Sequence, residues 1–500
     1  MKKLLLLSVL GIFVSVSSCK KDETPAPTYN NPTVVAPTSI TETMVGETGS
    51  VTFTVSVDSK LTATYAATGT NVTITNPSGD VTGTSVKIDY TAGTTAGAAS
   101  ISLKITDSQG NTSEQTAVMN MTAVPADPIA NHAFNISSDV TWTADSIHVL
   151  RGRITVLSGA TLTIEPGTII KGDIGTDVNA TCLLIARGGK INATGTATKP
   201  IIFTSINDEL GLKEVAAGNF GSPNLAPDVN GQWGGLIILG KAHISVSTGS
   251  NEAQIEGIPT SDTNGLYGGT DDADNSGVLK YVSVRHGGTL IGAGNEINGI
   301  TLGGVGSGTT IDHIEVVANQ DDGIEFFGGM PTLTNVVIWN AGDDGLDTDQ
   351  AFRGTIENFA IITASNSSFE LDGPEGDYGN TLTGHTFNKG YVVLGATQDG
   401  HFIDNDANTI VNLKNIYGKS FALNSQNITE VFTNYTTTYG VTFENITLDV
   451  ASADLKNYID KYKDDATTPI PSTIAAGTTQ YADLTVFDGW SWTALAGKLQ

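Results

Sequence analysis

The stretch T310-I-D-H-I-E-V-V317 decides the fold, because it returns as L333-T-N-V-V-I-W339 and again as I356-E-N-F-A-I-I362. Each copy has an apolar residue, two other residues and a second apolar residue. The copies follow one another at a period in the low twenties, with glycine-rich turns between them and no helical periodicity. Short β-branched strands at this period indicate a solenoid. We therefore predict an all-β chain whose main part is a right-handed parallel β-helix.

The register of the repeat also aligns polar residues. It brings together Asn335, Asn358, Asn415 and Asn445, the last two from L413-K-N-I-Y417 and F443-E-N-I-T-L448. Asparagines at one position of successive coils predict a ladder of stacked amides at a turn. A leucine-rich repeat is disfavoured, because its leucine-asparagine consensus is absent.

Carboxylates recur at fixed offsets from the aligned positions Val316, Ile338 and Ile361. The offsets align Asp321 with Asp343 and Asp322 with Asp344, and they stack Glu325, Asp347 and Glu370 with Asp349 and Asp372 beside them. Apolar residues alternate with these carboxylates, so the carboxylates are expected to face outward as an acidic ladder. At a coil spacing of about 4.8 Å, stacked carboxylates raise one another's pKa or share a cation.

Three interpretations of the ladder stay open. The first is Ca²⁺ binding by Glu325, Asp347, Asp349, Glu370 and Asp372, because calcium accepts six to eight oxygen ligands. The second is acid/base catalysis on a glycan by paired carboxylates. The third is a set of solvated acidic turns that keep the protein soluble.

A second candidate calcium site is D271-D-A-D-N-S-G277. Asp272, Asp274 and Ser276, followed by Gly277, match the first half of a calcium-binding loop. The position at which such a loop needs its bidentate Glu holds Ser283 instead. The alternative is an acidic turn between coils.

The composition limits the possible partners. The chain has 500 residues, 39% hydrophobic and 15% charged, and a net charge of −27. An acidic chain of this kind is not expected to bind nucleic acid, because a phosphate backbone needs Lys and Arg. The charge allows divalent cations and neutral or cation-bridged polymers.

The N-terminus predicts export and anchoring. Lys2 and Lys3 precede the apolar run L4–V14, which is a secretory signal over residues 1–18. The small residues before Cys19 resemble a bacterial lipobox, which implies a lipidated Cys19. The following K20-K-D-E23 resembles the export tag of surface-exposed Gram-negative lipoproteins. We expect a lipid anchor in the outer membrane and exposure at the cell surface.

Four further segments follow the signal. Residues 19–35 are polar and proline-rich and predict a tether. Residues 36–124 alternate, as in V51-T-F-T-V-S-V57, and predict an immunoglobulin-like β-sandwich. The β-helix is expected over 126–450. Residues 451–500 are expected to form a C-terminal helix and capping segment, with a helix over 451–463 covering the open end of the solenoid.

Several phrases of the β-helix resemble a known family. G159-A-T-L-T-I-E-P-G-T168, G231-Q-W-G-G-L-I-I-L-G240, Y267-G-G-T-D-D-A-D-N-S-G277 and D321-D-G-I-E-F-F-G-G329 are similar to bacterial secreted β-helix lipoproteins with the pectin-lyase-like fold. The resemblance covers about residues 130–450. It implies the fold and the location, and it assigns no activity.

A further resemblance concerns catalysis. N319-Q-D-D-G323 and G342-D-D-G345 resemble the Asn-x-Asp and Asp-Asp motifs of polygalacturonases, which implies Asp321, Asp343 and Asp344 as acid and base. The Gly-His-Gly that polygalacturonases carry in the next coil is replaced here by S365-N-S-S368. A pectate lyase would need a basic residue beside calcium, for which Arg353 and R285-H286 are the candidates.

The sequence therefore leads to one expected function and two alternatives. The expected function is a cell-surface lipoprotein whose β-helix binds a glycan or surface polymer with the support of calcium. The first alternative is a polysaccharide hydrolase or lyase that uses the stacked aspartates. The second alternative is a structural adhesin or spacer.

Overall fold

The computed structural model describes residues 27–40, 42–123, 125–176, 179–292, 295–376, 384–395, 402–406, 408–419, 440–458 and 472–500. The chain divides into two compact units, Met1–Ala126 and Asp127–Gln500, and the division falls in the proline-containing segment 125–128. The predicted signal, Cys19 and most of the predicted tether lie outside the described residues. Within the described ranges, no helix has both the length and the apolar character that a membrane span needs.

The first unit consists of two sheets around one core. The strands are β1 Thr33–Val35, β2 Thr43–Met44, β3 Thr48–Ser56, β4 Ala63–Thr70, β5 Val72–Ile74, β6 Ser78–Asp80, β7 Ser85–Ala92, β8 Gly97–Asp107 and β9 Thr112–Thr122. They form the sheets β1-β3-β7-β5 and β2-β9-β8-β4-β6. Alternate residues of the longer strands β3, β7 and β8 are buried, among them Phe53, Ile88 and Ile101 at 0% exposure. This arrangement is a β-sandwich, and its immunoglobulin-like type stays a prediction.

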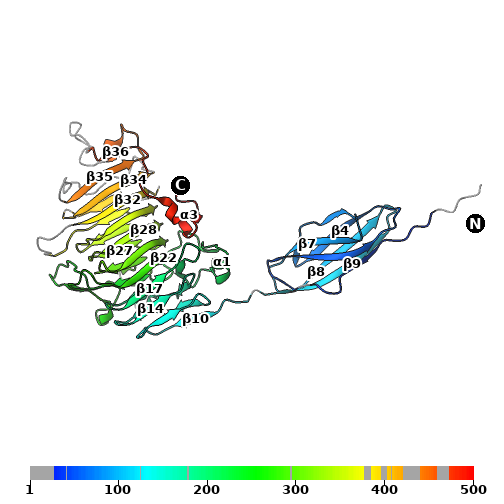
Figure 1. Cartoon of the computed structure of the whole chain (residues 1–500), viewed down its shortest axis with the longest axis horizontal. Helices are drawn as coiled ribbons and strands as arrows, with labels where there is room; N and C mark the ends of the chain where they lie inside the picture. Colours follow the sequence, from blue (N-terminus) through cyan, green and yellow to red (C-terminus); the bar gives the residue numbers. More distant parts are fainter. Residues whose placement is uncertain are drawn as a thin grey trace, which may run out of the picture. The chain divides into compact units, whose positions relative to one another are not determined.

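The second unit is a parallel β-helix, as predicted (Figure 1). Its longer sheet holds β10 Ile129–His132, β12 Ile147–Leu150, β15 Ile169–Gly172, β18 Ile201–Ser205, β22 Gly277–Arg285, β26 Thr310–Val317, β28 Thr332–Trp339, β30 Thr355–Ile362, β32 His385–Val393, β34 Val411–Lys419, β35 Val441–Leu448 and β36 Ile474–Ala476. It is joined by β11 Val140–Trp142, β14 Thr161–Ile164 and β17 Lys190–Thr194.

The shorter sheet of the β-helix carries the acidic residues. It holds β13 Ile154–Val156, β16 Leu183–Ile185, β19 Leu236–Leu239, β25 Ile300–Gly303, β27 Ile324–Phe327, β29 Leu346–Asp349, β31 Phe369–Leu371 and β33 Ile403–Asn405. Short elements outside both sheets are α1 Leu212–Ala216, β20 Glu252–Gln254, η2 Thr263–Gly265, β21 Leu266–Gly268, β23 Leu290–Gly292 and β24 Asn295–Glu296.

The predicted coil register is confirmed. Ile314 pairs with Val336 and Val336 with Phe359, and all three side chains lie in the solenoid core at 0% exposure. Val316, Ile338 and Ile361 form the next row. Stacked apolar rows of this kind supply the burial that holds a solenoid together.

The predicted asparagine ladder is confirmed as two pairs, because Lys389 occupies the position between Asn358 and Asn415. Asn335, Asn358, Asn415 and Asn445 lie at a left-handed bend inside their strands, with φ between 54° and 59°. Asparagine tolerates this conformation better than most residues. Asn358 Nδ2 donates to Asn335 Oδ1, and Asn445 Nδ2 donates to Asn415 Oδ1, both at 2.8 Å.

The C-terminal part differs from the prediction in two ways. β36 pairs in parallel with β35, so the β-helix extends beyond residue 450. Of the predicted helix over 451–463, residues 451–454 are not helical, Leu455–Tyr458 form the 3-10 helix η4, and 459–463 lie outside the described residues.

The last residues pack on the flank of the solenoid and do not cap its end. They contain the 3-10 helix η5 Leu484–Phe487 and the helix α3 Trp492–Leu495. Trp490 lies edge-on to Tyr281 at 5.5 Å, and Trp492 lies edge-on to Trp339 at 5.7 Å. These partners come from middle coils, because that flank presents an apolar row that the tryptophans can cover.

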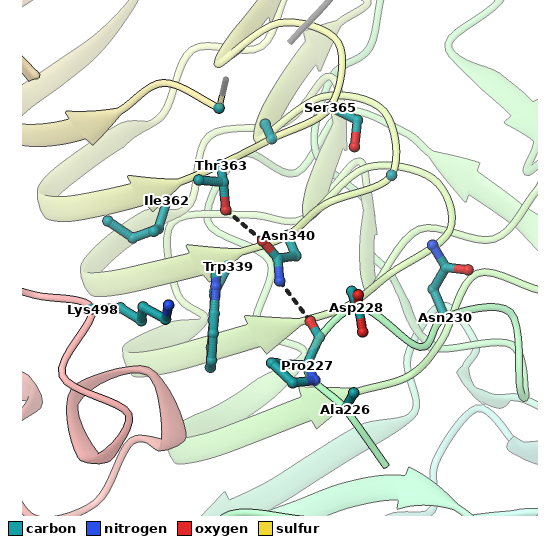
Figure 2. A pocket seen from close by; sticks show the side chains of 13 residues that line it. Ala226, Pro227, Asp228, Asn230, Trp339, Asn340, Ile362, Thr363, Ser365 and Lys498 are labelled. Atoms are coloured by element: carbon teal, nitrogen blue, oxygen red, sulfur yellow. Dashed lines mark hydrogen bonds between the residues drawn. The ribbon is translucent and has the colours of Figure 1, made fainter. Parts of the chain in front are cut away.

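The insertion 206–230 lies beside the same flank. Asn340 Nδ2 donates to the Pro227 carbonyl at 2.7 Å, which ties the insertion to the turn after β28 (Figure 2). The insertion, the middle coils and the C-terminal segment therefore meet on one side of the solenoid.

Candidate functional site

The shorter sheet places the predicted carboxylates in one stack. Glu325 of β27 pairs with Asp347 of β29, which pairs with Glu370 of β31. The alternating residues Ile324, Leu346 and Phe369 lie in the core at 0% exposure. The carboxylates therefore face away from the core, as predicted from the repeat.

The expectation of a solvated ladder is wrong at its centre. Glu325 is 9% exposed and Asp347 is 7% exposed. The segment 241–268 covers this face of the sheet, with Tyr267 packed against Phe327 and donating to Gln350 Oε1 at 2.8 Å. The centre of the ladder is thus enclosed between the sheet and an insertion.

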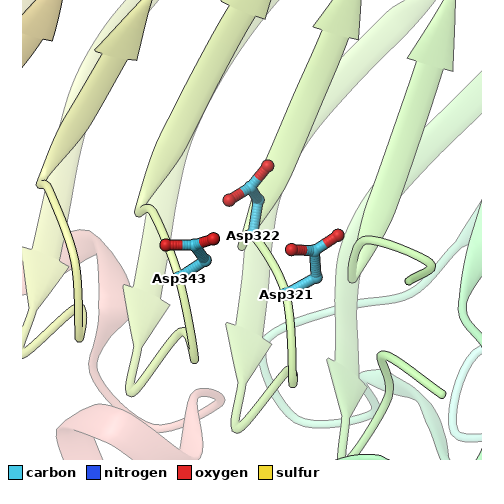
Figure 3. Close-up of side chains that lie close together, drawn as sticks. All are labelled: Asp321, Asp322 and Asp343. Carbon is cyan, nitrogen blue, oxygen red and sulfur yellow. The ribbon is translucent and has the colours of Figure 1, made fainter. Parts of the chain in front are cut away.

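The carboxylates gather around Asp322. Three sets of side chains each place their oxygen atoms within 4.8 Å of one another, and Asp322 belongs to all three: Asp321, Asp322 and Asp343; Asp322, Glu325 and Asp347; Asp322, Asp344 and Glu370. Figure 3 shows the first set on two successive turns. Asp321 and Asp343 are partly exposed, whereas Asp344 is 1% exposed.

Asp322 was not selected from the sequence as a site residue. The repeat did align it with Asp344, and this alignment was the available signal. The Asp344 amide donates to Asp322 Oδ1 at 2.9 Å, and the Ser367 amide donates to Asp344 Oδ1. Each turn is thus fixed to the next by a backbone amide and an aspartate.

Burial raises the pKa of every carboxyl at the centre of the cluster. It raises the pKa of Asp344 to about 9, with Glu370 as the next cause. The pKa values of Asp322, Glu325 and Asp347 also lie well above the usual range, because burial and the neighbouring carboxylates both oppose ionisation. At neutral pH these groups need protons or a cation.

The polar contacts leave room for such a cation. Asp347 Oδ1 is buried without a hydrogen-bond partner, and Glu325 Oε2 accepts from Asn298 Nδ2. Across the described ranges, neither of these carboxylates, nor Asp322 or Asp344, forms an ion pair with Lys, Arg or His. Clustered carboxylate oxygens without a protein counter-ion are the donors that a hard cation such as Ca²⁺ prefers.

Asp349 and Asp372 lie beside the ladder, two residues further along the chain than Asp347 and Glu370. Burial raises the pKa of Asp349 to about 7 and that of Asp372 to about 6. Asp349 Oδ1 accepts from the Gln350 amide at 2.5 Å. Neither residue belongs to a set of three close ligand groups among the described side chains.

The predicted loop 271–277 is held by protein contacts. Asp272 Oδ1 accepts from His243 Nδ1 at 2.9 Å and from Arg353 at 2.8 Å. Asp274 accepts from the Lys241 amide, and Ser276 is buried with its hydroxyl directed at the Leu239 carbonyl. These side-chain oxygens thus form hydrogen bonds within the protein. Calcium binding by the loop stays a prediction.

The residues considered as bases for a lyase are buried or paired with carboxylates inside the protein. Arg353 pairs with Asp272 at 2.8 Å. Arg285 is 0% exposed and pairs with Glu315 at 3.3 Å, and His286 is also fully buried. None of the three is therefore placed to take a proton from a substrate on the surface.

Comparison with known proteins identifies the fold family. A pectate-lyase-like β-helix domain model matches residues 134–494. No curated protein matches the chain. One similar solved structure is a lipoprotein from Bacteroides thetaiotaomicron, with 12% identity, a TM-score of 0.16, and coverage of 20% of this chain and 88% of that one.

Another is a family 28 exopolygalacturonase from Yersinia enterocolitica, with 10% identity, a TM-score of 0.19, and coverage of 84% of this chain and 87% of that one. At these scores neither structure assigns an activity. The domain match, however, spans well over half of the chain and coincides with the parallel coils. The chain therefore belongs to the pectate-lyase-like β-helix family.

Proposed function

We propose that the β-helix binds a polysaccharide or other cell-surface polymer, and that calcium at the cluster around Asp322 supports the binding site. The observation that carries the proposal is the buried set Asp322, Glu325 and Asp347, which lacks a protein counter-ion among the described residues. The family is named for pectate, a polysaccharide, so polysaccharides are the first partners to test.

The residues of the cluster have different roles in the proposed site. Calcium, when bound, would supply the positive charge that allows the buried carboxylates to ionise. Asp322 and Asp344 accept amide hydrogens from the following turns and so fix the positions of those turns. Asp321 and Asp343 on these turns, together with Glu370, are partly exposed and are the members of the cluster that a polymer can reach.

The proposal includes the cellular location. The signal and lipobox-like residues before Cys19 support export and a lipid anchor in the outer membrane of a Gram-negative bacterium. A surface-exposed β-helix would then meet polymers outside the cell. Labelling of Cys19 by a radioactive fatty acid in cells would test the anchor.

The pH dependence of stability tests the cation site. Because burial raises the pKa of Asp344 to about 9 and that of Asp349 to about 7, the folded state holds protons that the unfolded state releases near pH 4. Without calcium, the melting temperature of the β-helix is expected to fall as the pH rises from about 4 to about 9. Calcium is expected to raise it at pH 8 and to have little effect at pH 5.

Differential scanning calorimetry in a chelator and in calcium would measure both effects. Magnesium at the same concentration is the control for ionic strength. A melting temperature that calcium leaves unchanged at pH 8 would remove the metal from the proposal and leave shared protons as the means of neutralisation.

A hydrolase is the second candidate function, favoured by the partly exposed Asp321 and Asp343 beside Asp322. Paired carboxylates are the usual groups for glycoside hydrolysis. If this candidate holds, the protein releases reducing sugar from a uronic-acid polymer, and Asp343→Asn lowers the rate about 100-fold or more. Asp271→Asn, an exposed change outside the cluster, is the control. A broad polymer panel without product would exclude hydrolysis.

A further inference from the structure

A separate pocket of about 510 Å³ opens on the flank where three distant parts of the chain meet. The insertion supplies one wall, the turns after β28 and β30 supply the floor, and the C-terminal segment supplies the other wall (Figure 2). Its volume lies within the roughly 300–1,000 Å³ of small-molecule sites. The residues that matter to the argument are Asp228, Asn230, Trp339, Asn340, Ser365 and Lys498.

The floor of the pocket is fixed by hydrogen bonds inside the protein. Asn340 has a positive φ of 56°, donates to the Pro227 carbonyl at 2.7 Å and accepts from the Thr363 hydroxyl. The side-chain amide of Asn340 thus forms hydrogen bonds within the protein and is not available to a ligand. They instead hold the insertion at a defined distance from the coils, so the pocket is formed before a ligand arrives.

The remaining polar groups are of opposite charge. Lys498 and Asp228 both line the pocket, and in the described part of the chain neither forms an ion pair, with the other or with a third residue. Ser365 and Asn230 also line the pocket, and the Asn230 amide nitrogen donates to the Asn319 carbonyl at 3.4 Å.

The aromatic wall does not suit a sugar ring. Trp339 is 3% exposed, Trp492 lies against it, and the Lys498 ammonium lies 5.6 Å from its ring centre. A sugar platform needs an open aromatic face. Recognition in this pocket therefore rests on the two charges, since the apolar lining residues Ile362 and Ala364 are only 3% and 2% exposed.

We propose that this pocket binds a small zwitterion, such as an α-amino acid or a short peptide. The ligand carboxylate pairs with Lys498, and the ligand ammonium pairs with Asp228. A sugar acid would satisfy Lys498 but bring a second negative charge towards Asp228, and a simple amine would do the reverse. This site is independent of calcium and of the polymer proposed above.

Isothermal titration calorimetry of the whole protein would test the site with leucine and glycylleucine, and with N-acetylleucine, leucinamide and galacturonic acid as single-charge ligands. Saturable binding of leucine or glycylleucine is expected, with at least a tenfold weaker affinity for each single-charge ligand, because each of these ligands lacks one of the two ionic contacts. Lys498→Met and Asp228→Asn are each expected to weaken zwitterion binding by about tenfold or more.

Lys190→Met is the matched control, since Lys190 is an exposed lysine outside the pocket. Thermal melts of the three variants check that each is folded. Absence of saturable binding by both zwitterions, or equal binding of leucine and N-acetylleucine, would overturn the proposal. Preference for galacturonic acid would also overturn it and would assign the pocket to a sugar acid.

Discussion

Replacing Glu315 by alanine is expected to destabilise the β-helix by about 3–5 kcal/mol, because it leaves a buried arginine without its counter-ion. Glu315 and Arg285 are both 0% exposed, and Arg285 also donates to Ser283 Oγ at 2.7 Å. Glu315 Oε1 accepts from the Thr493 amide and hydroxyl, each at 2.8 Å. The substitution therefore breaks an ion pair and the anchor of the C-terminal segment together.

Urea unfolding followed by tryptophan fluorescence would measure the loss, since Trp490 and Trp492 flank the anchor. Glu444→Ala is the matched control: Glu444 pairs with Lys414 at 3.3 Å on the surface, and an exposed pair of this kind contributes at most about 1 kcal/mol. The double variant Arg285→Met/Glu315→Leu should recover only part of the stability, because the uncompensated charge is gone while the Thr493 contacts stay broken. Equal losses in Glu315→Ala and Glu444→Ala would contradict the argument.

Asp322→Asn is expected to abolish the response to calcium, because Asp322 belongs to all three groups of close carboxylates. At a calcium concentration about 1,000 times the Kd, the wild-type protein should gain about 4 kcal/mol, and the variant should gain almost nothing. In chelator at pH 8 the variant should be more stable than the wild type, because one mutually repelling carboxyl has been removed. The amide oxygen of asparagine can still accept the hydrogen bond from the Asp344 amide.

Asp274→Asn is the control, and it also separates the two candidate calcium sites. Asp274 accepts from the Lys241 amide, a bond that asparagine can retain. Calorimetric titration of both variants with calcium would locate the ion. If Asp274→Asn loses the response and Asp322→Asn keeps it, the ion lies in the loop 271–277 and the cluster holds protons.

The sequence predicted those features that repeat. Ile314, Val336 and Phe359 stack as expected, because coil register depends only on the period and on the alternation of strand residues. The same logic placed Glu325 above Asp347. The repeat could not predict that the segment 241–268 covers the ladder. This segment has no period, and its Tyr267 reaches Gln350 through long-range packing.

Two other features were not predicted. Arg285 and Glu315 lie on neighbouring coils in the common register, since Ser283 pairs with Glu315, but the repeat does not show which side chains of adjacent coils form an ion pair. The docking site of Trp490 and Trp492 was not predicted, because the C-terminal residues share no register with the coils. Asp322 was visible in the alignment with Asp344, but its central position follows from the three-dimensional convergence of neighbouring turns. Periodic positions were thus predictable, and insertions and termini were not.

The attachment of the C-terminal segment to a middle coil changes how the solenoid should fold. In a simple repeat array each coil contacts only its neighbours, so terminal coils can fray while the rest stays intact. Here the Thr493–Glu315 contact closes a chain loop of 178 residues. The coils inside that loop cannot complete their polar contacts until synthesis has reached the last residues, so folding is expected to finish late and as one cooperative step. The middle coils are therefore expected to reach their final stability only after the whole chain is available for folding.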